Sequence, residues 1–262
     1  MDLQLQGRHA LITGGSRGIG LACAREFLHE GCKVSLVGRD PQRMAAAQAA
    51  LGAGADRLAG FCADLREPEA ALRAVDAAEA ALGPIDVLVN SAGAARRTPH
   101  DELQAQAWHD ALQAKFFTYV HVLDPVLRRM GARGAGAVVN VVGMGGKLAS
   151  ATHLPGGAAN AALMLASAGL AAAWAPRGVR VNAVNPSLTL TDRLAEGLAV
   201  DARQRGTSPE EALRAAERKA PLGRLARPEE VAAVVVFLAS PRASYISGAV
   251  LSVDGAATPM VV

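Results

Sequence analysis

The sequence predicts an α/β fold in which a doubly wound parallel sheet of seven strands carries helices on both faces. Short aliphatic runs alternate with longer helical segments along the 262 residues. The strand runs are almost continuously apolar, as expected for strands that are covered on both faces. Hydrophobic residues make up 51% of the chain but aromatic residues only 3%, so aliphatic side chains must form the core.

The elements follow one another in a regular order. Each expected strand is a short run rich in Val, Ile, Leu or Ala; the seven runs are HALIT (9–13), KVSLVG (33–38), RLAGFC (57–62), IDVLVN (85–90), AVVNVV (137–142), VRVNAV (179–184) and VLSVDG (250–255). Helical segments connect them at residues 18–30, 41–52, 67–82, 102–131, 157–174 and 228–239. No repeat or linker interrupts this alternation, so we expect one domain over residues 1–262.

The region at about 188–222 departs from the alternation because it is charged, helical and inserted before the last helix and strand. In an open α/β sheet, such an insertion lies over the carboxyl ends of the strands, where ligands bind. We therefore expect a lid. The alternative is a surface helical hairpin that does not contact a ligand.

Charge and cysteine content exclude several classes of protein. The net charge is +3 and the basic residues are scattered, so nucleic-acid binding is not expected. The three cysteines, Cys23, Cys32 and Cys62, show no CxxC spacing and indicate reduced thiols in a cytoplasmic protein. The six histidines lack ligand spacing with carboxylates or thiols, so no metal site is expected.

The segment from Leu148 to Pro176 contains no Asp, Glu, Lys or Arg and resembles a membrane span at first sight. It is mostly alanine and glycine, however, and is therefore only weakly hydrophobic. We expect a helix that a sheet covers on one side and a partner subunit covers on the other, with no membrane contact.

A glycine-rich loop, TGGSRGIG, joins the first strand to the first helix. Its glycines at positions 14, 18 and 20 allow a sharp turn and a close approach to a pyrophosphate. The free N–H groups and the positive dipole at the start of the helix then receive the phosphate charge. The strand–loop–helix context predicts a Rossmann-type dinucleotide site, whereas glycines alone also occur in ordinary tight turns.

Further motifs give the whole chain a resemblance to the short-chain dehydrogenase/reductase family: ADL (63–65), NSAG (90–93), VNAVNPS (181–187), RPEEVAAVVVFLAS (227–240) and ISGAVLSVDGA (246–256). The resemblance implies a homo-oligomer, dimer or tetramer, formed through the two long central helices. It also implies a set of cofactor-binding residues: Gly14, Ser16, Arg17, Gly18, Ile19, Gly20, Arg39, Asp64, Leu65, Asn90, Ala92, Gly93, Asn160, Pro186, Thr189 and Thr191.

The residues after the second strand favour NADP(H) over NAD(H). An acidic residue there would bind a ribose 2′-OH and repel a 2′-phosphate, but this chain has Gly38 and Arg39. Arg17 in the glycine loop supplies a second guanidinium, and two guanidiniums suit a phosphate dianion. The alternative is that both arginines are solvated surface residues.

The four side chains that the resemblance assigns to catalysis are all replaced. Gly143 stands at the serine position, Gly156 at the tyrosine position, Asn160 at the lysine position and Lys115 at the asparagine position. The lysine and asparagine substitutions look reciprocal, so the Lys115 ammonium is expected to enter part of the vacated pocket.

Three residues are therefore the candidate catalytic groups. Desolvation would bring Lys115 toward neutrality and make it a proton donor or base. His153 is the other titratable group nearby, and Asn160 retains hydrogen-bonding capacity toward ribose hydroxyls. A solvated Lys115 and a solvent-facing His153 are the alternatives. Tyr119, one helical turn after Lys115, is expected to serve packing or a subunit interface.

The sequence thus predicts an NADP(H)-dependent oxidoreductase that acts on a carbonyl/alcohol pair of a small molecule through an atypical proton relay. A catalytically inactive NADP(H)-binding homologue, acting as a subunit or regulator, is the main alternative. Dehydration or isomerisation on the same scaffold is a third. The sequence does not identify the substrate.

Overall fold

A computed structural model describes residues 2–93 and 97–260, without the side chains of residues 196, 200, 201 and 203–205. Its seven strands form one parallel sheet in the order β3-β2-β1-β4-β5-β6-β7. The strands are β1 (His9–Thr13), β2 (Lys33–Gly38), β3 (Leu58–Cys62), β4 (Val87–Asn90), β5 (Gly136–Val141), β6 (Val179–Pro186) and β7 (Val250–Val253). The predicted fold class is confirmed.

The strand order reverses between β1 and β4, which lie side by side in the middle of the sheet. Thr13 at the end of β1 pairs with Asn90 at the end of β4, so the loops that follow the two strands begin at the same edge. A crevice opens at such a switch point because the segments that follow the two strands lead to opposite faces of the sheet. This topology positions the candidate site.

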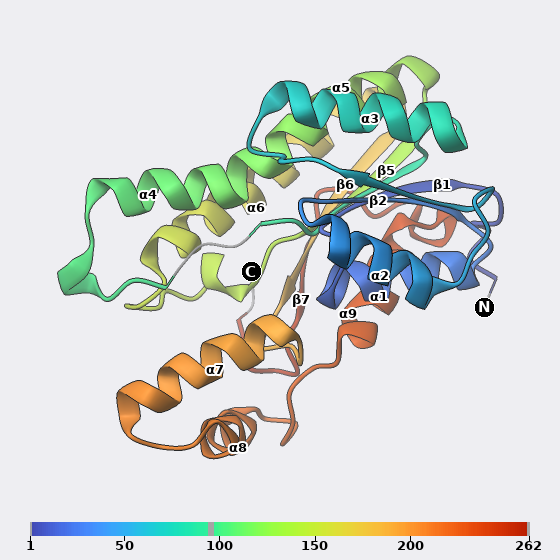
Figure 1. The fold of residues 1–262 in the computed structure, drawn as a ribbon. Coiled ribbons are helices and arrows are strands. Elements are labelled where there is room, and N and C mark those ends of the chain that lie inside the picture. The colour runs from blue at the N-terminus through green and yellow to red at the C-terminus, as the bar shows by residue number, and fades with distance from the viewer. Residues whose placement is uncertain (1, 94–96, 261–262) are drawn as a thin grey trace.

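Helices cover both faces of the sheet (Figure 1). One core lies between the sheet and α1 (Gly18–His29), α2 (Pro41–Leu51) and α9 (Pro228–Ala239). The other lies under α3 (Pro68–Leu82), α5 (Thr118–Arg133) and α6 (Leu154–Trp174). Successive side chains of a strand point to opposite faces of the sheet and so enter different cores: Ile12 of β1 belongs to the first core and Leu11 to the second.

The single helix expected over 102–131 is wrong in detail. A 3₁₀ turn (His100–Glu102) precedes α4 (Ala105–Ala111), a π-helical segment (Leu112–Phe117) follows, and α5 begins at Thr118. Hydrophobic periodicity does not separate these helix types, because a short π segment shifts the buried face by only one residue. Such segments occur frequently at functional sites.

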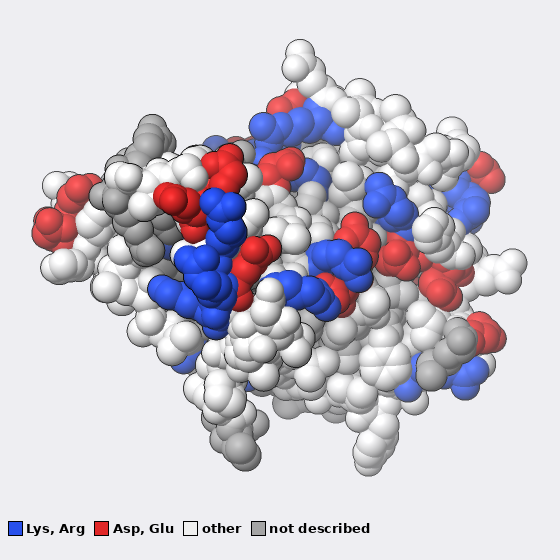
Figure 2. Space-filling view, turned by 90° about the horizontal axis from the view of Figure 1, so that it is seen from below, with Lys and Arg blue, Asp and Glu red and all other residues white. Residues whose placement is uncertain are grey.

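The inserted region, for which the sequence predicts a lid, contains α7 (Asp192–Arg205) and α8 (Pro209–Lys219), which project below the layers in Figure 1. Its base is held by backbone hydrogen bonds from Leu190 N to Ala226 O (2.8 Å) and from Ala226 N to Leu188 O (3.2 Å). Figure 2 views the molecule from this side and shows basic and acidic side chains interspersed. The mixed charge indicates a solvated outer surface.

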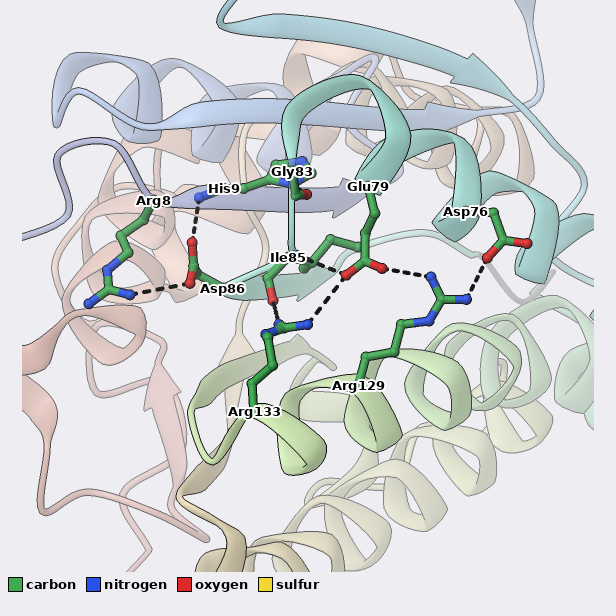
Figure 3. Close-up of polar contacts among 9 residues, drawn as sticks. All are labelled: Arg8, His9, Asp76, Glu79, Gly83, Ile85, Asp86, Arg129 and Arg133. Carbon is green, nitrogen blue, oxygen red and sulfur yellow. Dashed lines mark hydrogen bonds and ion pairs between the residues drawn. The ribbon is translucent and has the colours of Figure 1, made fainter.

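At the amino ends of the strands, the end of the sheet opposite to the switch-point loops, charged side chains form a network of ion pairs (Figure 3). Glu79 of α3 accepts hydrogen bonds from Arg129 of α5 (2.7 Å) and from the backbone N–H of Ile85 (3.1 Å), and it pairs with Arg133 (3.5 Å). Arg129 also pairs with Asp76. The network joins α3, α5 and the segment before β4 at the amino ends of the strands.

One helical stretch in the described chain, Leu154–Arg177, has the length and the mean hydropathy (1.4) of a membrane span. Its residues Leu163, Ser167 and Ala171 are buried against the sheet, and a helix that covers a sheet passes the same test. Leu165 on another face is 78% exposed. The expectation of a sheet-covered helix is confirmed for the inner side.

Candidate active site

A cavity of about 740 Å³ lies at the carboxyl ends of the central strands, between the sheet and the start of α7. Most of the predicted cofactor-binding residues line it: Gly14, Ser16, Arg17, Gly18, Ile19, Arg39, Asp64, Leu65, Ala92, Gly93, Pro186 and Thr191. Gly20, Asn90, Thr189 and Asn160 lie outside this lining. The cavity therefore collects residues that are far apart in the sequence but share one edge of the sheet.

The glycine loop needs its glycines for close packing. Gly14 has φ +67°, and a Cβ there would lie 2.9 Å from the backbone N of Ala92. A Cβ on Gly20 would lie 2.3 Å from the carbonyl oxygen of Gly14. Arg17 is the N-cap of α1, and its guanidinium, which has only donors, does not cap the first amides of the helix. This cradle fits a pyrophosphate.

Arginines surround the end of the cavity near β2 and β3. Arg43 and Arg66 line it together with Arg39, although the sequence analysis did not single them out. Arg66 donates from Nε and Nη2 to Asp64, and this hydrogen bonding lowers the pKa of the Asp64 carboxyl. The Asp40 carboxylate caps α2 by accepting from the N–H groups of residues 42 and 43. Asp40, the acid nearest to Arg39 in the sequence, also lines the cavity and pairs with Arg43 (3.4 Å), so the helix cap and an ion pair both hold its carboxylate.

A buried chain of hydrogen bonds supports the loop after β4. Asn90 accepts from Thr13 Oγ1 (3.3 Å) and donates to Asn140 Oδ1 (3.1 Å), and Asn140 donates to Ser167 Oγ (2.9 Å). Thr13 Oγ1 also accepts from the N–H groups of Ser91 and Ala92. Asn90 therefore lies beneath the cavity and shapes the loop. Thr189 lies shortly before α7, where it forms an isolated parallel β-bridge with Ala226.

Lys115 lies in the π-helical segment, lines the cavity and is only 8% exposed. Its Nζ donates to Tyr119 Oη (2.8 Å) and to the carbonyl oxygen of Val141 (3.0 Å). Gly93 makes the close approach of this segment possible, because a Cβ there would lie 2.3 Å from the carbonyl oxygen of Ala114. The structure thus places Lys115 in the cavity wall, and its role in catalysis stays a prediction.

Burial, together with a smaller effect of the nearby Arg193 guanidinium, lowers the pKa of Lys115 to about 7. Burial raises the pKa of Tyr119 far above its ordinary value. Tyr119 is 0% exposed, which confirms a packed position and excludes a surface position for its side chain. An amine that titrates near neutrality beside a cavity can both donate and accept a proton.

His153 and Asn160 lie beside the same glycine turn. A Cβ on Gly145 would lie 3.3 Å from His153 Cδ2 and 3.4 Å from Asn160 Nδ2, and a Cβ on Gly143 would lie 3.5 Å from Asn160 Nδ2. His153 Nδ1 and Asn160 Oδ1 are buried without a hydrogen-bond partner in the described structure. Burial lowers the pKa of His153, and the charges of Arg97, Arg193 and Lys115 add to this effect.

Some residues that line the cavity are not among the predicted catalytic or cofactor-binding residues. Arg193, at the start of α7, lines the cavity and donates to the carbonyl oxygen of Gly93 (3.2 Å). No local signal identifies this contact, because the two residues are a hundred positions apart. Arg43 lies in the first turn of α2, which begins two residues after Arg39, and its place in the sequence was the signal that could have identified it. Within the described ranges, His, Cys, Asp and Glu side chains form no group of three that could hold a metal ion.

Comparisons with known proteins agree with this architecture. The family model described as enoyl-(acyl carrier protein) reductase matches residues 14–258. The chain is 36% identical to D-threitol dehydrogenase of Mycolicibacterium smegmatis, over 98% of this chain and 95% of that protein. It is 33% identical to gluconate 5-dehydrogenase of Gluconobacter oxydans, over 97% and 96%.

Solved structures are also similar. L-sorbose reductase of Gluconobacter frateurii, complexed with NADPH and L-sorbose, matches with a TM-score of 0.92 and 30% identity over 100% of both chains. An NADPH-bound short-chain oxidoreductase of Pseudomonas aeruginosa PAO1, described as containing an atypical catalytic center, matches with a TM-score of 0.87 and 32% identity, over 97% and 98%. By fold, motifs and these similarities, the chain belongs to the short-chain dehydrogenase/reductase family of oxidoreductases.

Proposed function

We propose that this chain is an NADP(H)-dependent oxidoreductase that interconverts an alcohol and a ketone, with Lys115 in place of the usual tyrosine as the proton donor and acceptor. The main support is the position of Lys115: a buried amine in the wall of the cavity that the glycine loop lines, held by two oxygen acceptors. It is an atypical member because Gly143, Gly156 and Asn160 stand where the family's serine, tyrosine and lysine are expected.

The cofactor-binding residues act as follows in this proposal. The amides at the start of α1 hold the pyrophosphate, and Gly14 and Gly18 let the backbone approach it. Arg17 and Arg39 bind the 2′-phosphate, and the NADPH complexes of similar structures agree with that preference. When bound, the nicotinamide supplies or takes up the hydride. The protein supplies orientation and the proton.

The hydrogen bonds of Lys115 determine which of its protons is transferred. An ammonium has three N–H bonds, and two of them are used by Tyr119 Oη and by Val141 O. The third is directed away from both acceptors and is the one available to a substrate oxygen. During reduction this proton moves to the carbonyl oxygen, and during alcohol oxidation the neutral amine takes the hydroxyl proton.

Asn160 and His153 complete the site in this proposal. Asn160 binds a hydroxyl of the nicotinamide ribose or of the substrate, since its Oδ1 is buried without a partner. His153 Nδ1 is likewise buried and unpaired, and it exchanges a proton or a hydrogen bond with the substrate. A buried polar atom without a partner costs about 1–3 kcal/mol. Ligand binding would recover that free energy at both residues.

A small hydroxylated molecule is the substrate class that we favour. Relatives are named for D-threitol, gluconate and galactitol, and a similar structure contains L-sorbose. A substrate with several hydroxyls would satisfy the unpaired atoms of Asn160 and His153. Residues 188–222 act as the lid over it, within a single domain. We also propose a homo-oligomer that uses the exposed face of α6.

The decisive experiment measures NADPH oxidation with ketoses and NADP⁺ reduction with polyols for the purified chain and for Lys115→Met, His153→Ala and Lys147→Met. Lys115→Met should lower kcat by about 10²–10⁴-fold and keep the Kd for NADPH within about twofold. Lys147→Met serves as the matched control and should keep both values. Saturable NADPH binding without turnover on any compound would refute the proposal in favour of an inactive nucleotide-binding homologue.

A further inference from the structure

Tyr119 makes polar contacts that its packing does not require. Its ring is fully buried in the core under α5, where a phenylalanine would fill nearly the same volume. Its hydroxyl nevertheless meets two polar groups: it donates to the carbonyl oxygen of Val141 (2.5 Å) and accepts from Lys115 Nζ (2.8 Å). Lys115 Nζ also lies 4.6 Å from the centre of the Tyr119 ring. The tyrosine therefore contacts the proposed proton donor through both its oxygen and its ring.

The directions of these hydrogen bonds follow from the groups involved. A lysine donates and does not accept when it is charged, so the phenol oxygen must accept from it. The single phenol proton is then free to point at Val141 O, whose second lone pair receives an N–H from Lys115. The three groups form a closed triangle. This triangle holds the Lys115 amine in one position, because moving Nζ away would break its hydrogen bonds to both Tyr119 and Val141.

We propose that Tyr119 is a positioning residue for Lys115, so that a lysine and a tyrosine four residues apart act together here with the lysine as the reacting group. The inference rests on the proposed function of Lys115 and adds a second residue to it. In the usual family arrangement that the resemblance implies, a tyrosine reacts and a lysine assists. In this chain the two residue types lie on the helix formed by the π segment and α5, and their roles are exchanged.

The surroundings of Lys115 make its protonation sensitive to this partner. Among the described residues, the charged or titratable groups that face it are Tyr119, Arg193 at the start of α7 and His153 at the start of α6. Arg193 opposes the ammonium form, and none of the three supplies a carboxylate. The Tyr119 oxygen is thus one of two acceptors that stabilise the charged amine, and its loss should favour the neutral form.

The test is a direct titration of Lys115 by NMR with labelled lysine, which does not depend on turnover. The chain has four lysines, Lys33, Lys115, Lys147 and Lys219, so Lys115→Met assigns the signal. In Tyr119→Phe the midpoint of Lys115 should fall by about one pH unit, since a hydrogen bond to a charged group is lost. Tyr245→Phe, the same change at the chain's other tyrosine, which is fully exposed, should leave the midpoint unchanged.

Turnover gives a second readout. At pH 7 the reduction rate of Tyr119→Phe should fall about fivefold, because the protonated fraction falls from about one half to about one tenth. The rate should recover toward pH 6. A purely structural role would lower the rate by the same factor at every pH, and that result, or an unshifted Lys115 midpoint, would overturn the inference. If the midpoint of Lys115 is unshifted in Tyr119→Phe but the native enzyme turns over and Lys115→Met does not, only the positioning role of Tyr119 is refuted, and the proposed function of Lys115 is retained.

A measurement without a destabilising substitution covers the case in which Tyr119→Phe does not fold. 3-Fluorotyrosine is incorporated into Tyr245→Phe, so that position 119 carries the only fluorine. Its ¹⁹F shift should change with the midpoint of Lys115 and lose this change in Lys115→Met. A ¹⁹F shift that is independent of pH between 5 and 9 would refute the coupling between the two side chains.

Discussion

Replacing Lys115 by methionine should change the pH dependence of stability in a way that can be calculated from its burial. The pKa of Lys115 is about 7 in the folded protein and 10.5 in an exposed reference state. Between these values the unfolded chain holds more protons than the folded one, so stability rises with pH across that interval. From pH 7.5 to 9.5 the contribution of this one group is about 2.5 kcal/mol.

The assay is urea unfolding at 25 °C at both pH values, for the native chain, Lys115→Met and Lys147→Met. Burial also raises the pKa of Cys23 and Cys32, whose unfolded thiols ionise in this range and act in the opposite direction. The relevant quantity is therefore the difference between native and variant. Lys115→Met should lack about 2.5 kcal/mol of the native increase, whereas Lys147→Met should keep it. Native and Lys115→Met curves that run parallel within about 0.5 kcal/mol would show that Lys115 is not a neutralised amine in the folded protein.

Four further substitutions test other parts of the structure. Gly143 has φ +121° and ψ 149°, a region that is essentially restricted to glycine, so Gly143→Ala should destabilise the fold by about 1–3 kcal/mol. Gly197→Ala, in open space on α7, should instead stabilise it by about 0.5–1 kcal/mol; the opposite ranking in chemical unfolding would contradict the assigned backbone. Arg39→Asp should raise the Kd for NADPH by about 10–100-fold and lower the Kd for NADH, as measured by calorimetry; an unchanged ratio of the two would remove Arg39 from the 2′-phosphate site. Glu79→Gln should lower the free energy of unfolding by about 1–3 kcal/mol with little change in kcat, because it weakens three contacts at the far edge of the sheet; a loss of activity without a loss of stability would show that this reasoning is mistaken.

The strands could be predicted from the sequence because both of their faces are covered, which makes each one a continuous apolar run. The ranges 9–13 and 33–38 agree with β1 and β2, and the other strands differ by at most two residues at either end. The glycine loop could be predicted for a similar reason, since its backbone geometry requires particular residues at fixed spacing.

The contacts that join distant segments could not be predicted in the same way. The spacing of Lys115 and Tyr119 places them on one helix face, but it does not reveal Val141 O, the carbonyl that both of them bind from β5. The π segment and the contact between Arg193 and Gly93 depend on tertiary packing as well. Sequence patterns therefore found the reactive residue types, and the three-dimensional arrangement supplied their partners.

The separation of the ion-pair network from the cavity has a practical consequence for engineering. A five-residue strand such as β1 spans roughly 15 Å, so the two ends of the sheet are far enough apart for substitutions to add independently. Residues around Glu79 can accordingly be varied to raise thermal tolerance while the pocket around Lys115 is redesigned for new substrates. Libraries for the two purposes can be built and screened separately, then combined in a single chain.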